Sequence, residues 1–339
     1  MPQYYAGIDL SARSSWICVV NAAGDRQVSR KVANDPECIA QILDPFLPDL
    51  SAVVESTFNW YWIVDVVEDL GAEVKLAHPL YIKAIAYAKV KTDRVDAHTL
   101  AQLLRMNYIP EAFIYPRELR PTRDLVRRRH RLVNLRAGLY RDLQLQLMKH
   151  NVTSFSRNAI KKLDGRNLRA LMTHMHDRRC GIAWLHVIDA LDKEIAELDR
   201  IIQASVRGHK PVVLLKTIPG IGKTLAPTIY YEVGQISRFA SDKAFASYSR
   251  VAPTIAQSGA VSRQGKNRKQ GNRYLKWAFS EAAHLAVVKY PAIREYYNCL
   301  LKKKKKRILA KAIMAHKIAI AAFHVLKEEK PYRPGVLPA

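Results

Sequence analysis

Four acidic residues stand where a carboxylate is unusual: Asp9, Glu55, Asp93 and Asp96. Asp9 and Glu55 end short apolar runs that are typical of buried strands, so each is expected at a strand end that a metal or a substrate can reach. Asp93 and Asp96, three residues apart, are expected on one face of a helix. Carboxylate oxygens are the ligands that Mg²⁺ prefers, and two cations bridged by such groups catalyse phosphoryl transfer. Taken singly, each acid could instead be a solvated or helix-capping group.

A second candidate residue is Ser258, which precedes Gly259 in a segment rich in Ser, Gly and Gln. A serine in such a segment is usually a turn residue. Here the flexible glycine neighbour would expose its Oγ as a nucleophile, and the basic residues that follow would hold a scissile phosphate. These basic residues are Arg263, Lys266, Arg268, Lys269 and Arg273.

The charge of the chain indicates a polyanionic partner. The 339 residues carry a net charge of +25, which destabilises a compact chain unless a partner neutralises it, and nucleic acid is the first candidate. Residues 1–80 have a net charge of −6 and the remainder +31. Two further basic clusters are predicted to contact phosphates rather than form only a solvated face. They are Arg127, Arg128, Arg129 and Arg131, and then Lys302, Lys303, Lys304, Lys305, Lys306 and Arg307.

Several other classes of site are excluded by spacing. The four cysteines are far apart and form no CxxC pair, which argues against a zinc site or a disulfide framework and fits a reducing cytoplasm. The Walker A pattern fails because residue 217 is Thr where the pattern requires Gly. His174 and His176 have no further ligands nearby in the sequence. The N-terminus lacks the pattern of a signal peptide, and a cytoplasmic protein without a membrane partner is expected.

The first third of the chain predicts an α/β layer with a mixed sheet. Strands are expected at residues 3–8, 16–20, 26–32, 52–55 and 73–77, with a hairpin turn at 21–25. Helices are expected at 35–47 and 58–70, and a further helical region starts at His78-Pro79. The order of three hairpin-linked strands followed by alternating helices and strands favours this fold class.

The rest of the chain is expected to be mainly helical. Leucines three or four apart run through residues 117–150, and apolar residues from Trp184 to Ile202 alternate steps of four and three, which predicts a pair of long helices in a coiled coil. Pro219-Gly220-Ile221-Gly222 lies between apolar helical segments and resembles a helix-hairpin-helix, whose turn offers N–H groups to a phosphate.

Almost the whole chain resembles the DEDD transposases of bacterial insertion-sequence family 110, including its 1111 subgroup. Their N-terminal motifs are matched by GID at Asp9, VVEST at Glu55 and TDRVDA at Asp93 and Asp96. Their C-terminal motifs are matched by IPGIG, by Pro253 to Gly259 and by GNRYLKWA. The resemblance implies a RuvC/RNase-H-like metal-binding domain at 1–115, a helical coiled-coil region at 116–210 and a C-terminal transposase domain at 211–330.

The family resemblance also implies a reaction. The four acids would bind Mg²⁺, with Mn²⁺ as a substitute, and Ser258 would attack DNA to form a covalent phosphoserine link. A structured guide RNA encoded by the element would pair with donor and target DNA, and the protein would assemble as a tetramer, a dimer of dimers, on the bacterial nucleoid. Asp9 and Ser258 are far apart in the chain, so the active site is a candidate for assembly between protomers.

One position departs from the family pattern, and two alternative functions stay open. Family members often have Glu-x-Thr-Gly where this chain has Phe58 after Thr57, and Phe58 lacks the backbone freedom of glycine. A RuvC-like junction nuclease would use the same four acids with water in place of Ser258. A non-catalytic nucleic-acid-binding protein would need none of them for chemistry.

Overall fold

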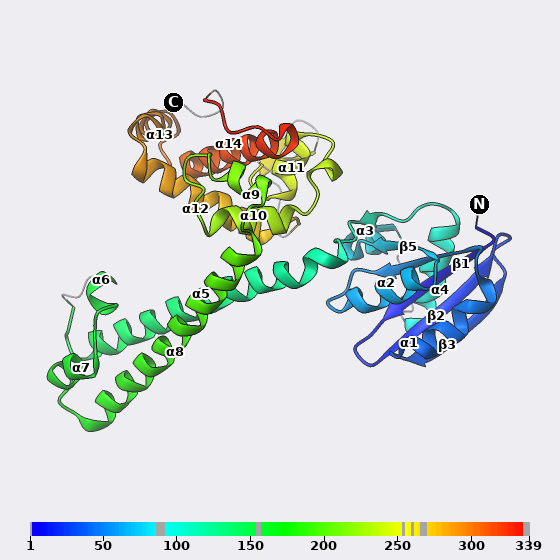
Figure 1. Ribbon diagram of the computed structural model, residues 1–339, viewed down its shortest axis with the longest axis horizontal. Coiled ribbons are helices and arrows are strands. Elements are labelled where there is room, and N and C mark those ends of the chain that lie inside the picture. Colours follow the sequence, from blue (N-terminus) through cyan, green and yellow to red (C-terminus); the bar gives the residue numbers. More distant parts are fainter. Residues whose placement is uncertain are drawn as a thin grey trace. The chain divides into compact units, whose positions relative to one another are not determined.

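The computed structural model describes residues 2–85, 92–153, 157–252 and 270–334, together with the backbone of 255–258 and 261–264. The chain forms two compact units, Met1–Arg117 and Glu118–Ala339 (Figure 1). We refer to them as the N-terminal unit and the C-terminal unit. The three domain boundaries expected from the sequence stay a prediction.

The N-terminal unit is built on a six-stranded mixed sheet (Figure 1). Its strands are β1 (Tyr4–Leu10), β2 (Ser14–Asn21), β3 (Arg26–Ala33), β4 (Leu50–Glu55), β5 (Glu73–Ala77) and β6 (Glu111–Ala112). They lie in the order β3-β2-β1-β4-β5-β6, with β1, β4 and β5 parallel and β2 antiparallel to both neighbours. This confirms the predicted mixed sheet. The sequence does not predict β6, because two residues are too few to show the alternation of a strand.

Four helices of the N-terminal unit fall in the predicted helical regions. They are α1 (Pro36–Leu43), α2 (Trp60–Asp69), α3 (Pro79–Ile85) and α4 (Asp93–Arg105). The side chain of Asp35 accepts a hydrogen bond from the Cys38 amide, and that of Thr92 accepts one from the Val95 amide, so both α1 and α4 begin with a capping residue. The Thr92 cap fixes where α4 starts and therefore places Asp93 and Asp96 in its first turn.

Helix α4 packs directly on β1 because residue 7 has no side chain. A Cβ atom added to Gly7 would lie 2.1 Å from the carbonyl oxygen of Ala97 and 2.5 Å from the amide nitrogen of Ala101. Both atoms belong to the backbone of α4, so neither can move aside without moving the helix. Gly7 is therefore required for the contact between this helix and the sheet.

We expect Gly7→Ala to lower the free energy of unfolding by about 1–3 kcal/mol or more, because overpacking forces the backbone of α4 away from β1. Denaturant unfolding measures the change. Gly222→Ala is the matched control, since nothing lies within 4 Å of a Cβ at that position. Equal stability of the two variants would contradict the close packing of α4 on the sheet.

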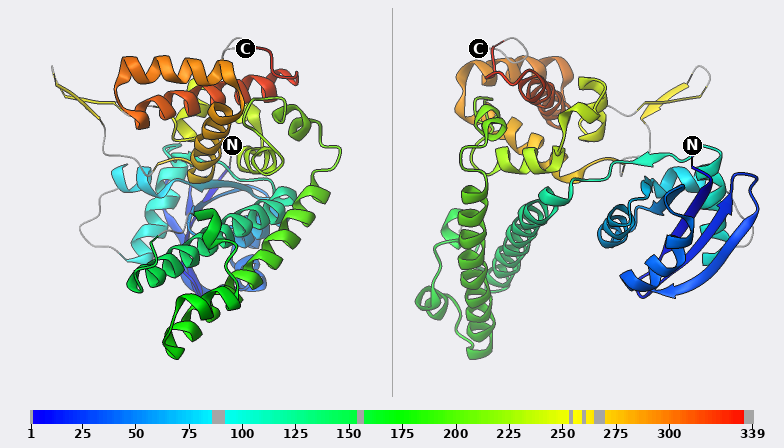
Figure 2. Two further views of the ribbon diagram at one scale, coloured as in Figure 1. Left: turned by 90° about the vertical axis from the view of Figure 1, so that its left-hand side faces the viewer. Right: turned by 45° about the vertical axis from the view of Figure 1, so that its right-hand side comes forward.

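Two long antiparallel helices form the first part of the C-terminal unit and lie side by side (Figure 2). They are α5 (Arg120–Lys149) and α8 (Met175–Ser205), with the short helices α6 (Arg157–Ile160) and α7 (Gly165–Leu171) between them in sequence. Ion pairs join Arg129 to Asp199 and Arg136 to Asp192, so the chain directions are opposite. We refer to α5 and α8 as the arm.

The contact face of the arm follows part of the predicted apolar stripe. Ile188, Ile195 and Ile202 are seven residues apart and buried, whereas Leu135 on α5 is exposed. The spacing of the buried isoleucines confirms the predicted pairing of two long helices. The supercoil of a coiled coil stays a prediction.

The second part of the C-terminal unit is a helical bundle with a small hairpin. Its helices are α9 (Lys210–Leu215), α10 (Leu225–Val233), α11 (Asp242–Tyr248), α12 (Arg273–Lys289), α13 (Pro291–Lys304) and α14 (Arg307–Glu328). The hairpin consists of β7 (Ile255–Ser258) and β8 (Val261–Gln264). The mixed sheet in the N-terminal unit and this mainly helical part confirm the α/β plus α fold class.

Helix α14 forms the centre of the bundle core. Among the described residues, it is the helix long and apolar enough to cross a membrane, by length and composition only. Half of its most apolar stretch is buried within the protein, and Met314, Ile318 and Ala322 pack in the core. A buried core helix satisfies the same test, so the length and composition of α14 are weak evidence for a membrane span.

The glycine-rich turn at Pro219–Gly222 connects α9 to α10, as the apolar segments predict. Gly220 has a φ of +88°, and a Cβ there would lie 2.1 Å from the carbonyl oxygen of Ala282 on α12. The glycine is thus needed for the packing of this turn against the bundle. A helix-hairpin-helix contact with phosphate stays a prediction.

Candidate functional site

Asp9 and Glu55 lie at the same end of two neighbouring strands. Ile8 of β1 is paired with Val54 of the parallel strand β4, and Asp9 and Glu55 are the next residues on the two strands. Asp9 is on the same face as Gly7, which contacts α4. Glu55 is on the same face as Val53, which packs against Leu100 and Leu104 of α4. Both carboxylates therefore belong to the sheet face that α4 covers.

Asp93 and Asp96 reach that face from α4. Gln102 and Arg105, near the C-terminal end of α4, donate to the turn at Ala22–Gly24 beside the start of β1, so the first turn of α4 lies toward the end of β1 that carries Asp9. Asp96 is half-buried and Asp93 is exposed. The four predicted acids thus gather at one end of one face of the sheet. Within the described part of the chain, no three His, Cys, Asp or Glu side chains already form a group that could hold a metal ion.

The donor set nevertheless fits a hard divalent cation, because all four groups are carboxylates. Two are carried by neighbouring strand ends and two by the first turn of one helix. The residues that would hold the cation are Asp9, Glu55, Asp93 and Asp96, each within the N-terminal unit.

The turn after Glu55 does not require the glycine found in the family pattern. Phe58 is 86% exposed, and it is not among the residues with a left-handed backbone. The amide of Ser56 donates to the carbonyl oxygen of Ala77, and the amide of Thr57 donates to that of Glu55. These bonds hold the chain beside Glu55 independently of residue 58.

Next to the acids, Cys18 and His98 form a neutral pair on the same sheet face. The Cys18 Sγ lies 3.5 Å from the His98 Nδ1. Burial raises the pKa of the Cys18 thiol, while the charges of Arg26 and Arg94 act in the opposite direction. Burial lowers the pKa of His98, and the charge of Arg26 lowers it further. The pair therefore adds no charge to the carboxylate site at neutral pH.

Ser258 lies at the far end of the β7–β8 hairpin. It is paired with Val261, the first residue of β8, while Ile255 and Gln264 pair at the base. The serine therefore belongs to a short two-stranded hairpin, where the sequence predicts a loop. The backbone of Arg263 is paired with Ala256 on the same hairpin. The predicted phosphate ligands Lys266, Arg268 and Lys269 lie outside the described residues.

Several predicted phosphate ligands already have partners inside the C-terminal unit. The guanidinium of Arg127 forms two hydrogen bonds of 2.6 and 2.8 Å with Glu232, and that of Arg129 forms two with Asp199. Arg273 donates to the Tyr274 hydroxyl at 2.9 Å. Arg128 and Arg131 are exposed. The internal ion pairs compete with phosphate contact at Arg127 and Arg129, and a phosphate role for the cluster stays a prediction.

Glu232 is not among the residues predicted from the sequence. It is the most buried ionisable group among the described residues of the C-terminal unit. Its side chain is 0% exposed and accepts hydrogen bonds from Arg123, Arg127 and Asn272. Burial alone would raise the pKa of Glu232, but the bond from Arg127, the charges of Arg123 and Arg127 and the bond from Asn272 hold it below its ordinary value. The sequence feature that could have indicated Glu232 is its position as an isolated acid within the apolar helical run at 225–233.

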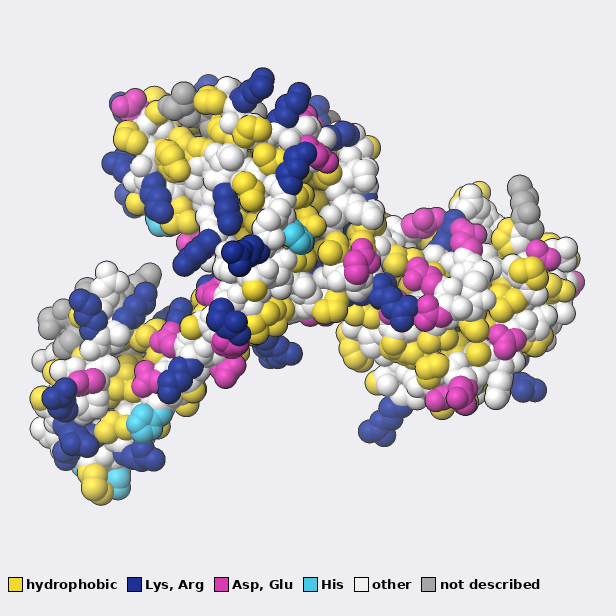
Figure 3. All heavy atoms as spheres, in the orientation of Figure 1, with side chains coloured by type: hydrophobic (Ala, Val, Ile, Leu, Met, Phe, Trp, Pro, Cys, Tyr) yellow, Lys and Arg dark blue, Asp and Glu magenta, His cyan; other side chains and the backbone are white. Residues whose placement is uncertain are grey.

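The lysine run is solvent-exposed at the connection between α13 and α14. Lys302 to Lys304 end α13, Lys305 has a left-handed φ of 54°, and Lys306 precedes α14. The connection therefore concentrates charge at one turn of the surface. Figure 3 shows Lys and Arg side chains spread over the visible face of the C-terminal unit, and several acidic side chains scattered over that of the N-terminal unit.

We expect replacement of Lys302 to Lys306 by Gln to weaken DNA binding and to flatten its dependence on salt by about 0.9 in the log–log slope for each phosphate that the variant no longer neutralises. Binding titrations at several salt concentrations measure this slope. Replacement of the same five residues by Arg keeps the charge and should keep the slope. An unchanged slope in the Gln variant would show that these lysines do not contact phosphates and are only solvated.

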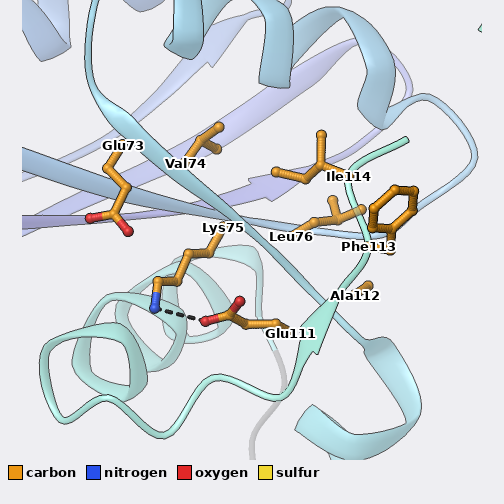
Figure 4. Close-up of a pocket in the computed structure, with 8 residues that line it drawn as sticks. All are labelled: Glu73, Val74, Lys75, Leu76, Glu111, Ala112, Phe113 and Ile114. Atoms are coloured by element: carbon orange, nitrogen blue, oxygen red, sulfur yellow. Dashed lines mark ion pairs between the residues drawn. The ribbon is translucent and has the colours of Figure 1, made fainter. Parts of the chain in front are cut away.

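A hollow on the N-terminal unit is separate from the four acids. It has a volume of about 380 Å³ and lies along β5 and β6, where Lys75 and Glu111 form an ion pair of 2.7 Å (Figure 4). Its polar lining consists of Glu73, Lys75 and Glu111, and none of the predicted site residues lines it. The candidate site is therefore an open sheet end and not this hollow.

Comparison with known proteins identifies two family regions in the chain. Residues 6–151 match the DEDD transposase family of IS110, and residues 212–298 match the transposase family IS116/IS110/IS902. The first region contains the four acids, and the second contains the turn at Pro219–Gly222, the Ser258 hairpin and α12.

Similar proteins come from several bacteria. The chain is 25% identical to a probable family 20 transposase of Pseudomonas aeruginosa, over 87% of this chain and 90% of the relative. It is 28% identical to a pilin gene-inverting protein of Moraxella bovis, over 77% of this chain and 74% of the relative. It is 23% identical to an uncharacterized 44.8 kDa protein of the insertion element IS116 from Streptomyces clavuligerus, over 98% of this chain and 96% of the relative.

Proposed function

Because this chain belongs to the IS116/IS110/IS902 family of insertion-sequence transposases, we propose that it excises and inserts its own element through a covalent link between Ser258 and DNA. The family establishes a DNA-recombining transposase. The observation that carries the finer proposal is the place of Ser258 at the end of a hairpin, with its basic neighbours, inside a family region. The "pilin gene-inverting" name of the Moraxella relatives fits an enzyme that exchanges DNA strands.

In the proposed reaction the N-terminal unit supplies the metal site. Asp9, Glu55, Asp93 and Asp96 would hold Mg²⁺, as a two-metal site, and Mn²⁺ would substitute for it. When bound, the cation polarises a phosphoryl oxygen and offsets the charge that develops on it. The position of the four acids toward one end of the same face of the mixed sheet supports this assignment.

The C-terminal unit supplies the nucleophile. Ser258 Oγ forms a bond to phosphorus while the bond from phosphorus to the deoxyribose oxygen breaks. The serine hydroxyl loses its proton to water, and the released deoxyribose oxygen takes up a proton. Arg263, Lys266 and Arg268 offset the charge of the phosphate during the transfer. The phosphoserine link conserves the bond energy, so that a second strand can later displace the serine.

The proposal includes a structured guide RNA that pairs with donor and target DNA, and a tetramer that brings two DNA duplexes together in the bacterial cytoplasm. The net charge of +31 on residues 81–339 is compatible with binding of RNA as well as DNA. A structured non-coding stretch beside the reading frame, complementary to the element junctions, is the genomic observation that would support the RNA.

The covalent step is tested with end-labelled junction DNA, the flanking RNA and Mg²⁺, followed by denaturing gel electrophoresis. We expect a slow-migrating protein–DNA adduct with the native protein and none with Ser258→Ala. Ser262→Ala is the matched control, because it removes another serine of the same hairpin and should keep the adduct. An adduct that persists in Ser258→Ala contradicts the nucleophile. Cleaved DNA without any adduct would favour the nuclease that uses water.

A further inference from the structure

The segment that carries Ser258 leaves and re-enters the helical bundle at one point. The amide nitrogen of Asn272 donates to the carbonyl oxygen of Tyr248 at 2.6 Å, which joins the end of α11 to the start of α12. Gly271 has a φ of +87°, and a Cβ there would lie 2.4 Å from the same carbonyl oxygen. We call the contact of Tyr248 with Gly271 and Asn272 the neck of the serine hairpin.

The side chain of Asn272 connects the neck to the bundle interior. Its Oδ1 accepts hydrogen bonds from the amides of Tyr274 and Leu275, so Asn272 caps the N-terminus of α12. Its Nδ2 donates to Glu232 Oε2 at 2.6 Å. The residue is 6% exposed. A single side chain therefore sets both the first turn of α12 and the point from which the hairpin leaves.

Glu232 in turn connects Asn272 to the arm. Its carboxylate accepts two hydrogen bonds from Arg127 and weaker ones of 3.3 Å from Arg123, both on α5. Because a buried charge is stable only with complete partners, this network allows little displacement of any member. Helix α10, the start of α12 and the arm helix α5 are thereby joined at one buried carboxylate.

We propose that Asn272 and Glu232 are positioning residues for the transfer reaction: through the neck they fix the base of the β7–β8 hairpin and so the place of Ser258. This inference rests on the proposed function of Ser258. The family regions assign no role to either residue. A displacement of about 1 Å at a reacting group can reduce a rate by about a hundredfold, so a network distant from the phosphate can still control the reaction.

The test uses Asn272→Ser, because serine retains a helix-capping oxygen and loses the bond to Glu232. At saturating DNA we expect the rate of Ser258 adduct formation to fall about a hundredfold, with an unchanged Kd for DNA. Amide hydrogen exchange at 255–258 and 261–264 should quicken by about tenfold, from the loss of one bond to a charged group, with no change in α14. Asp164→Ser, at the cap of α7 between the two arm helices in sequence, is the matched control and should alter neither quantity.

A rescue experiment separates positioning from general stability. Asn272→Asp places a second carboxylate beside Glu232 and should slow the adduct as Asn272→Ser does. The double variant of Asn272→Asp and Glu232→Gln again has one carboxylate and one amide in the network. We expect its rate of adduct formation to be at least about tenfold higher than that of Asn272→Asp alone. A double variant as slow as Asn272→Asp would overturn the proposed network.

The remaining outcomes are distinct. Unchanged hairpin exchange in Asn272→Ser overturns the neck as a constraint on the hairpin. Faster exchange with an unchanged adduct rate overturns positioning and leaves a structural contact. If the native protein itself forms no adduct that requires Ser258, the proposed function fails, and the exchange measurement alone then decides whether the neck holds the hairpin.

Discussion

Replacement of Asp9 by Asn should abolish strand exchange while the protein still folds and binds DNA. Asn has nearly the same shape, so the end of β1 is preserved, but it removes one negative oxygen from the predicted metal ligands. Loss of several kcal/mol of charge stabilisation corresponds to a decrease of about 10³-fold or more in rate. Strand exchange and adduct formation measure the effect, and DNA affinity is measured in parallel.

Two measurements make this prediction specific. Asp49→Asn is the matched control, because Asp49 is an exposed acid directly before β4 and lies outside the predicted site. Titration calorimetry with Mg²⁺ or Mn²⁺ should show binding to the native protein and weaker binding to Asp9→Asn. Unchanged strand exchange in Asp9→Asn would favour a nucleic-acid-binding protein whose acids are structural.

Replacement of Glu232 by Gln should lower the free energy of unfolding of the C-terminal unit by about 3–5 kcal/mol. The substitution keeps the size of the side chain but leaves Arg123 and Arg127 without a buried counter-charge. Denaturant unfolding followed by a probe in the bundle measures the change. Glu197→Gln is the matched control, since its ion pair with Arg200 is exposed on α8, and we expect no measurable change there.

The pH dependence of this stabilisation has a defined direction. The folded pKa of Glu232 lies below its unfolded value of 4.5, so its stabilising contribution is fully present above pH 4.5. It is lost as the pH falls below that value and through the folded pKa. The difference in unfolding free energy between the native protein and Glu232→Gln should thus be constant near neutral pH and shrink in acid. A difference independent of pH over this range would show that the charge of Glu232 does not stabilise the fold.

The N-terminal unit could be read from the sequence because its signals are local. The short apolar runs of the strands and the turn at 21–25 each depend on a few neighbouring residues, and β5 spans the same residues as predicted. Asp9 and Glu55 lie at matching strand ends because β1 and β4 are parallel neighbours. The close contact of Gly7 with α4 could not be predicted from the sequence, because it depends on which helix packs on the sheet at that point.

The C-terminal unit was predicted only in outline. Helical periods indicated the long helices, but the internal partners of Arg127 and Arg129 are more than 60 residues away, and nothing in their local sequence distinguishes them from Arg128. Asn272 looks like an ordinary helix cap in the sequence. Its second bond, to Glu232, becomes visible only when α10 and α12 are placed together.

The neck also has a consequence for how this protein can diverge. Because Tyr248 and Asn272 already hold the two ends of the serine segment together, lengthening or shortening the chain between them changes the closure entropy of the loop by little, about 0.6 kcal/mol for a doubling of its length. Among the described residues of that segment, Val251 packs against the bundle core, and it lies just after α11 and outside the hairpin. Insertions, deletions and substitutions can therefore accumulate in the hairpin without unfolding the bundle. Selection is thus free to vary the length of this segment while the bundle core stays constant.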